Sequence, residues 1–292
     1  MRGRAVFAGC ARDCSPHLPL VLENISRIAT LFDETAFVFA ENDSIDDTRD
    51  RLQSFIRDRP NAQVLALDGL VQSEPVRTVR IAAARNACLD HARANYGGYD
   101  WFIMMDLDAV NRGPIDLGYV RQTLKFLTKD PKRCAAFANA HGFYYDIWAL
   151  RHPTLCPRDV WEDELDAVLL GLSDEQACRQ AVAGRVFSID PALRPIKVDS
   201  AFGGLAIYKL RQIMRSTARY DGVRSKTVSL PAPEGGEPVT THSMQLCEHV
   251  PFHAALRANG GDLFIMPCLI NHHGRKLEQV VWETGTYRKL LF

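Results

Sequence analysis

An apolar segment that ends in two aspartates is the feature that most constrains how this chain can fold. Residues 101–105 are all apolar, and Asp106 and Asp108 follow them directly. Such a run is typical of a buried strand, and residues two apart on an extended chain point to the same side. The two carboxylates therefore face one point where the strand ends. In an open α/β sheet, the carboxyl ends of the strands are where ligands bind.

The two aspartates predict a cation site. No obvious base partner stands beside them, so the pair favours a hard divalent cation held by oxygen ligands. A cation in such a position usually neutralises a phosphate or a diphosphate. The alternative interpretation is a solvated strand end at which the aspartates cap the next turn.

The composition argues against several classes of protein. The 292 residues carry 35 basic and 35 acidic side chains, so the chain lacks the basic footprint of a nucleic-acid-binding protein. No segment approaches the ~20 apolar residues that cross a bilayer, and the first apolar stretch is too short for a signal peptide. The eight cysteines form no CxxC pair, which argues against a zinc site or a disulfide framework. We therefore expect a cytoplasmic protein with free thiols, either soluble or peripheral at the inner face of the membrane.

The hydrophobic pattern predicts one α/β domain over residues 1–292. Strand and helix signals alternate over the first 110 residues, which is typical of βαβ units with a parallel sheet. A polar, partly helical stretch (153–184) and a proline- and glycine-rich loop that we expect to be mobile (230–238) follow later. The predicted strands are 5–8, 35–40, 63–67, 101–105, 134–138 and 263–269, with a further strand after a turn within 198–208. The predicted helices are 16–32, 46–56, 78–94, 117–127 and 247–259.

Three motifs occur in the order found in family-2-like glycosyltransferases. The stretch 40–48, Ala-Glu-Asn-Asp-Ser-Ile-Asp-Asp-Thr, resembles the N-D-x-S-x-D-x-T signature that follows their second strand. The tripeptides at 84–86 (Ala-Arg-Asn) and 106–108 (Asp-Leu-Asp) resemble their A-R-N and D-x-D pair. The chain as a whole resembles a GT-A nucleotide-sugar transferase, most closely over residues 1–110.

Later stretches give a narrower resemblance and two departures from the family pattern. Residues 145–151 and 200–204 are similar to capsule mannosyltransferase-like proteins. The usual N-D-G-S turn lacks its glycine here, and the usual E-D base motif appears as Glu248-His249.

The resemblance implies both a fold and an activity. The fold is a GT-A-like, Rossmann-like, mostly parallel sheet flanked by helices, with a nucleotide-binding half at 1–110 and an acceptor-binding half at 111–292. The activity is a metal-dependent hexosyl transfer from a UDP- or GDP-linked sugar to a hydroxyl of a saccharide or lipid-linked glycan, in glycan synthesis. Mn²⁺ or Mg²⁺ is the implied cofactor, and the family-2-like motifs favour inversion.

Two other functions are open to this sequence. A sugar nucleotidyltransferase would need a glycine-rich phosphate loop soon after the first strand, but residues 9–14 contain only one glycine. A non-catalytic carbohydrate-binding protein on the same fold would have lost the chemistry, and the intact aspartate pair argues against it.

For the metal, the resemblance implies that Asp108 binds directly and that Asp106 contacts the ribose or reaches the metal through water. His272 or His273 would supply a further ligand, since an imidazole can complete a carboxylate site. An ordinary surface pair of histidines is the alternative.

For the donor, the resemblance implies contacts from Asn42 and Asp43 to the base or ribose. The alternative is an Asx-turn that caps the next helix. Arg85, with Asn86 beside it, would reach the diphosphate, or would pair with Asp106 or Asp108 and hold the carboxylates in place. A solvated helix face is the expectation for Arg80.

The remaining candidates concern the sugar and the acceptor. Gly203 and Gly204 would bring backbone close to the donor sugar, unless they form an ordinary turn. Glu248 or His249 would be the base that takes the acceptor proton, although a carboxylate at a helix start also has a structural explanation. The aromatic residues Tyr145 and Trp148 would stack on the acceptor sugar, with a core position as the alternative.

Overall fold

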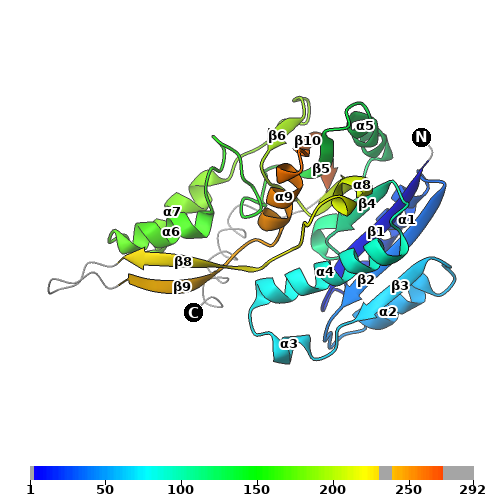
Figure 1. The fold of residues 1–292 in the computed structure, drawn as a ribbon, viewed down its shortest axis with the longest axis horizontal. Coiled ribbons are helices and arrows are strands. Elements are labelled where there is room, and N and C mark those ends of the chain that lie inside the picture. Colours follow the sequence, from blue (N-terminus) through cyan, green and yellow to red (C-terminus); the bar gives the residue numbers. More distant parts are fainter. Residues whose placement is uncertain (1–2, 230–238, 272–292) are drawn as a thin grey trace.

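An eight-stranded mixed sheet forms the centre of the molecule (Figure 1). The structure, a computed structural model, describes residues 3–229 and 239–271. The strand order is β3-β2-β1-β4-β7-β5-β10-β6. The bounds of these strands are β1 (Arg4–Ala11), β2 (Glu34–Glu41), β3 (Ala62–Ala66), β4 (Trp101–Met105), β5 (Arg133–Ala140), β6 (Ile196–Val198), β7 (Leu205–Lys209) and β10 (Asp262–Asn271).

Most strands of the sheet run in one direction. β1 pairs in parallel with β2 and β4, β2 with β3, and β5 with β10. β7 is antiparallel to both β4 and β5, and β6 is antiparallel to β10. The predicted fold class, a mostly parallel α/β sheet flanked by helices, is confirmed. The reversed insertion of β7 has no signal in the sequence pattern.

Helices cover both faces of the sheet. One buried cluster joins the sheet to α4 and α9, and a second joins its other face to α1, α2 and α5. β4 supplies side chains to both clusters alternately, and all five are buried, as the apolar run predicts. The helices are α1 (Leu18–Ala29), α2 (Thr48–Ile56), α3 (Leu70–Ser73), α4 (Arg77–Asn95), α5 (Leu117–Thr128), α6 (Val160–Leu169), α7 (Asp174–Ala181), α8 (Leu210–Met214) and α9 (His249–Ala258). Short 3₁₀ turns occupy Ala109–Asn111 and Ala183–Arg185.

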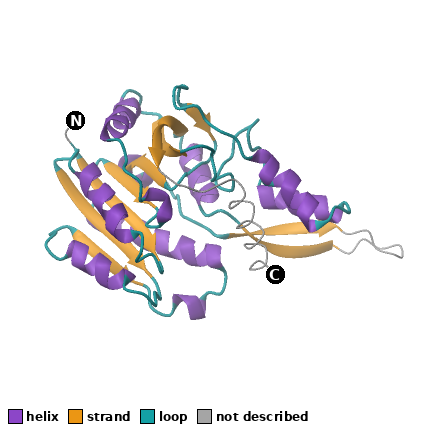
Figure 2. Ribbon diagram, turned by 180° about the vertical axis from the view of Figure 1, so that it is seen from behind, coloured by secondary structure: helices purple, strands orange, loops and turns teal. Residues whose placement is uncertain are grey.

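A two-stranded antiparallel sheet extends away from the main body. It consists of β8 (Val223–Ser229) and β9 (Val239–Gln245), with α6 and α7 alongside (Figures 1 and 2). Arg224 of β8 forms an ion pair with Glu162 of α6 at 2.5 Å, which ties the two layers together. The sequence pattern does not predict this pair of strands, and the loop expected at 230–238 lies outside the described residues.

The remaining predicted elements are found with shifted ends. The helix expected over 16–32 spans Leu18–Ala29, and the strand expected over 134–138 spans Arg133–Ala140. Within the described part of the chain, none of the helices combines the length and hydrophobicity needed to cross a membrane.

The turn before β7 brings two distant segments to the end of β4. Gly203 and Gly204 both have left-handed backbone, with φ of 65° and 79°. The backbone N–H of Asp106 donates to the carbonyl of Gly204 at 2.9 Å, so the turn extends the pairing beyond β4. A side chain at Gly203 would overlap the carbonyl oxygen of Ala138 on β5. This glycine is required by close packing of backbone as well as by its dihedral angle.

Gly203→Ala should therefore destabilise the fold more than Gly142→Ala. Both glycines have positive φ, and each alanine carries a conformational cost of about 1–2 kcal/mol. Only Gly203 adds a backbone clash, because a Cβ at Gly142 meets nothing within 4 Å. We expect a loss of unfolding free energy above about 3 kcal/mol for Gly203→Ala, measured by urea denaturation. Equal losses in the two variants would contradict this packing role.

Candidate functional site

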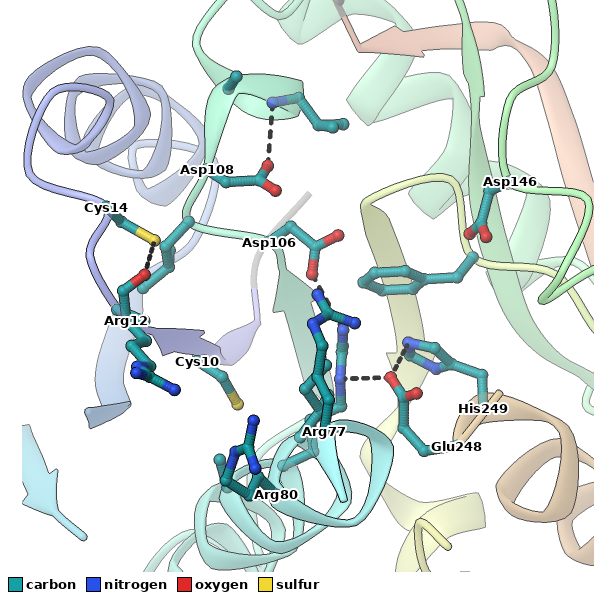
Figure 3. Close-up of a pocket in the computed structure, with 18 of the residues that line it drawn as sticks. Cys10, Arg12, Cys14, Arg77, Arg80, Asp106, Asp108, Asp146, Glu248 and His249 are labelled. Atoms are coloured by element: carbon teal, nitrogen blue, oxygen red, sulfur yellow. Dashed lines mark hydrogen bonds and ion pairs between the residues drawn. The ribbon is translucent and has the colours of Figure 1, made fainter. Parts of the chain in front are cut away.

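One cavity lies at the carboxyl ends of β1, β2 and β4, where an open α/β sheet binds its ligands. Its volume is about 640 Å³, which is within the range of small-molecule sites. Figure 3 shows that charged side chains from several elements point into it. These residues are acidic in one part of the wall and basic in another.

Of the five carboxylates that line the cavity, Asp13 pairs with Arg12 at 3.5 Å and the other four make up the acidic wall. Asp106 and Asp108 follow β4, Asp146 follows β5, and Glu248 directly precedes α9. The predicted convergence of Asp106 and Asp108 on one cavity is found in the structure. Asp146 belongs to the stretch 145–151 that carries the narrower resemblance, but no role in the site was predicted for it.

A buried arginine links two of these carboxylates. Arg85 lies on α4 and is only 6% exposed. Its Nη2 donates to Asp106 Oδ1 at 2.9 Å, and its Nε lies 2.9 Å from Glu248 Oε1. The pairing of Arg85 with Asp106, one of the two roles expected for it, is confirmed. Arg85 thus fixes carboxylates that come from segments far apart in the sequence.

The acidic wall favours bound positive charge. Burial raises the pKa of Asp106 to about 7; Arg85 opposes this shift, while the carboxylates of Asp108, Asp146 and Glu248 add to it. Burial likewise raises the pKa of Asp146 to about 6. A cation placed among these groups would relieve their repulsion and stabilise the ionised forms.

Asp108 has a structural contact as well as a place in the cavity. Its Oδ1 accepts a hydrogen bond from the backbone N–H of Val110 at 3.0 Å, at the start of the turn Ala109–Asn111. The capping interpretation is therefore correct for this residue. It does not exclude ligand binding, because a carboxylate has several lone pairs to offer.

The donor set fits a divalent cation that is shared with a phosphorylated ligand. No group of three or more potential metal ligands occurs within residues 3–229 and 239–271. Mg²⁺ and similar ions, however, are usually held by one or two carboxylates together with water and substrate phosphates. Asp106 and Asp108 supply such a pair. His272 and His273, the other predicted ligands, lie outside the described residues.

Arginines form the basic wall. Arg12 follows β1, and Arg77 and Arg80 lie in the first turn of α4. Arg80 Nη1 donates to the carbonyls of Glu74 and Pro75, both at 2.7 Å, which fixes the guanidinium at the cavity. Burial lowers the pKa of Arg80, and the charges of Arg12 and Arg77 lower it further. Arg80 therefore lines the cavity, whereas the sequence analysis expected it on a solvated helix face.

The two base candidates, Glu248 and His249, both line the cavity but are buried. Glu248 stands at the N-cap of α9 without a side-chain cap bond, and its charge there complements the helix dipole, as the structural explanation expects. His249 stacks on Phe202 at 3.9 Å, and its Nε2 lies 3.6 Å from Glu248 Oε1. Burial, then the charge of Arg85, holds the pKa of His249 well below its usual range, so the ring is neutral.

Of the predicted nucleotide contacts, Asn42 lines the cavity. The carboxylate of Asp43 instead accepts hydrogen bonds from the backbone of Gly69 (2.7 Å) and Val71 (2.8 Å) at the start of α3. The side-chain amide of Asn86 pairs with the backbone of Tyr220: its Nδ2 donates to the carbonyl at 2.9 Å, and its Oδ1 accepts from the N–H at 3.0 Å. These contacts give Asp43 and Asn86 structural roles, and their contact with a nucleotide stays a prediction.

Of the residues predicted to contact the sugars, two line the cavity and two do not. Tyr145 and Trp148 line the cavity, and Trp148 meets the ring of Trp161 edge-on at 6.3 Å. Gly203 and Gly204 lie behind the cavity wall, where a side chain at Gly204 would come within 2.5 Å of Val110. Packing explains both glycines, and their contact with a donor sugar stays a prediction.

Sequence reasoning missed two residues of the site, Arg12 and Asp146. Arg12 directly follows β1, but the strand was predicted only over 5–8, so the sequence did not place Arg12 at a strand end. Asp146 lies six residues beyond β5 in an aromatic segment, and only the folded path of that segment brings it to the cavity.

Comparison with known proteins gives likenesses of fold. No protein-family model matches the chain, and no curated protein sequence matches it. Among solved structures, the mannosyltransferase PcManGT from Pyrobaculum calidifontis has a TM-score of 0.47 at 16% identity, over 94% of this chain and 57% of that one. TarS (residues 1–349) from S. aureus has a TM-score of 0.49 at 10% identity, over 92% and 60% of the two chains.

A third similar structure is glucosyl-3-phosphoglycerate synthase from M. tuberculosis, with a TM-score of 0.44 at 14% identity, over 95% of this chain and 75% of that one. The chain spans less than two thirds of the length of the first two proteins. The predicted similarity to GT-A glycosyltransferases is found as a similarity of fold over most of the chain, at low sequence identity.

The buried Arg85 should matter far more for stability than an exposed arginine with equally short contacts. Arg85→Met leaves Asp106 and Glu248 without their cation, and breaking a buried pair costs about 3–5 kcal/mol. The matched control is Arg219→Met, because Arg219 donates twice to Asp90 (2.7 and 2.8 Å) at an exposed position. That change should cost at most about 1 kcal/mol. Urea unfolding at pH 7 measures both, and similar losses would show that Arg85 does not hold the site together.

Proposed function

We propose that this protein is a metal-dependent glycosyltransferase that moves a sugar from a nucleoside-diphosphate donor to a hydroxyl of a saccharide or lipid-linked glycan. One observation carries the proposal: a single cavity has carboxylates on one wall and arginines on another. A diphosphate that binds together with a divalent cation satisfies both walls at once. Neither wall alone would select such a ligand.

The residues divide the work of binding the donor. Arg12, Arg77 and Arg80 would bind phosphate oxygens, for which the planar guanidinium is well suited. Asp106 and Asp108 would hold Mn²⁺ or Mg²⁺, which when bound supplies Lewis-acid stabilisation of the departing diphosphate. Arg85 would keep the Asp106 carboxylate in position through its 2.9 Å contact.

The nucleoside and the sugars would extend to opposite sides of the diphosphate. Asn42 lies beside the basic wall at the end of β2, where it would contact the nucleoside. Tyr145 and Trp148 lie on the side of β5, where their rings would pack against the acceptor sugar. GDP-mannose and UDP-glucose are the first donors to test, since solved structures of PcManGT and of the M. tuberculosis synthase contain them together with Mn²⁺.

Asp108→Asn should abolish metal-dependent nucleotide binding and leave the fold intact. In thermal-shift experiments with GDP and UDP, a ligand that binds only the native state raises the melting temperature. We expect the wild type to respond to one nucleotide only when Mn²⁺ is present, and the variant to lose that response. Release of nucleoside diphosphate from the matching donor should fall by roughly a hundredfold or more.

Asp116→Asn is the matched control for this experiment. Asp116 also accepts a hydrogen bond from the backbone N–H two residues on, that of Gly118 at 2.6 Å, but it lies away from the cavity. It should keep the full nucleotide response. A wild-type shift that does not depend on metal, or one that Asp108→Asn retains, would contradict the proposed role of the carboxylate pair and would favour a non-catalytic carbohydrate-binding protein.

A further inference from the structure

Asp146 is held in the cavity wall by backbone that has little freedom to move. The N–H of Tyr144 donates to Phe187 at 2.7 Å, and the N–H of Arg151 donates to Ser200 at 2.9 Å, so both ends of the segment are tied down. Asp146 Oδ2 accepts a hydrogen bond from the N–H of Gly203 at 2.8 Å. A carboxylate oriented in this way can present its other oxygen to a ligand.

The carboxylate of Glu248 is already paired with a buried arginine. Its Oε1 lies 2.9 Å from Arg85 Nε, and its side chain is only 7% exposed. The Glu248 carboxylate is thus engaged by the buried guanidinium of Arg85 and is not free to face a ligand hydroxyl. Its position in the site is explained by the support it gives to Arg85 and, through Arg85, to Asp106.

His249 is no better placed as a base. Its ring is 1% exposed and lies between Phe202 and Tyr220, with ring centroids at 3.9 and 5.4 Å. The guanidinium of Arg85 stands over the same Phe202 ring at 4.6 Å. A proton on His249 would therefore create a second positive charge in an apolar pocket beside the first.

Asp146 differs from these groups in its charged neighbours. Within the described part of the chain it forms no ion pair with a basic side chain. Hydrogen bonds from the backbone N–H groups of Gly203 and Ala149 lower its pKa, as does the charge of Arg85, while the charge of Glu248 raises it. The negative charge of Asp146 in turn raises the pKa of Asp106 and of the phenols of Tyr144 and Tyr145. Burial raises its pKa to about 6, close to the value that suits a general base near neutral pH.

Asp146 also lies apart from two of the arginines that would bind the diphosphate. In Figure 3 it lies across the Asp106 carboxylate from Arg12 and Arg80. Trp148 also lines the cavity, and its buried Nε1 has no hydrogen-bond partner among the described residues, so it is available to a ligand. If Arg12 and Arg80 bind the diphosphate as proposed, a hydroxyl bound beside Asp146 would approach the sugar from the side away from the leaving group.

We propose that Asp146, and not Glu248 or His249, is the catalytic base of the transfer, an assignment that rests on the proposed glycosyltransferase function. The acceptor oxygen forms the new bond to the anomeric carbon as the bond from that carbon to the diphosphate oxygen breaks. The nucleoside diphosphate leaves with the bonding electron pair, and the hydroxyl proton moves to the Asp146 carboxylate. This course inverts the anomeric configuration.

The test compares Asp146→Asn with Glu248→Gln. The rate measured is release of GDP from GDP-mannose, or of UDP from UDP-glucose, with Mn²⁺ and with water as the acceptor, between pH 5 and 8. Because the base acts when deprotonated, the wild-type rate should fall as the pH drops through about 6. Asp146→Asn should lower the rate by about a hundredfold or more and flatten this pH dependence, and Asp146→Glu should restore part of both.

Nucleotide binding separates this inference from the function on which it rests. Asp146→Asn should keep the metal-dependent thermal shift with GDP or UDP, whereas Glu248→Gln should be slower but keep the fall in rate at acid pH. The base assignment is overturned if the rate of nucleotide release by Asp146→Asn lies within about threefold of the wild-type rate. It is also overturned if Glu248→Gln alone removes the pH dependence of that rate. Absence of any nucleotide shift in the wild type would instead refute the proposed function itself.

Discussion

The buried guanidinium of Arg85 is the interaction on which the rest of the site depends. It joins α4 to the end of β4 through Asp106 and to the start of α9 through Glu248, both at 2.9 Å. Without it, four carboxylates would face one cavity with no buried positive charge among them. Even with it, burial and mutual repulsion raise the pKa of Asp106 to about 7. The site is therefore organised so that a further cation stabilises it, and the arginines opposite supply the complementary attraction for an anion.

The parts of this arrangement that the sequence predicts are local ones. The strand at 101–105 and the shared direction of Asp106 and Asp108 follow from the two-residue period of extended chain, which needs no knowledge of distant residues. The pairing of Arg85 with Asp106 was one of two expected roles, because the motif order placed that helix beside the strand end. The alternation of strands and helices over the first 110 residues gave the parallel part of the sheet for the same reason.

The parts that the sequence could not supply depend on long-range pairing. The reversed direction of β7 brings Gly203 to Asp146 through a hydrogen bond across 57 residues of chain. Asp43 and Asn86 carry motif residues, yet their side chains bond to the backbone at Gly69 and Tyr220. A polar residue in a motif does not reveal which distant backbone group it will meet. That choice is made by the packed fold, and it decides which motif residues remain open to a ligand.

If the proposed function is right, a nucleoside diphosphate and a divalent cation bind in this cavity together. Electron paramagnetic resonance of free Mn²⁺, titrated with the protein in the presence and absence of GDP or UDP, measures this most directly. We predict that the protein with GDP or UDP bound binds Mn²⁺ more tightly than either the protein alone or the free nucleotide does. Mn²⁺ should tighten binding of that nucleotide to the protein by the same factor, because such coupling is reciprocal. Equal Mn²⁺ affinity with and without either nucleotide would contradict the account.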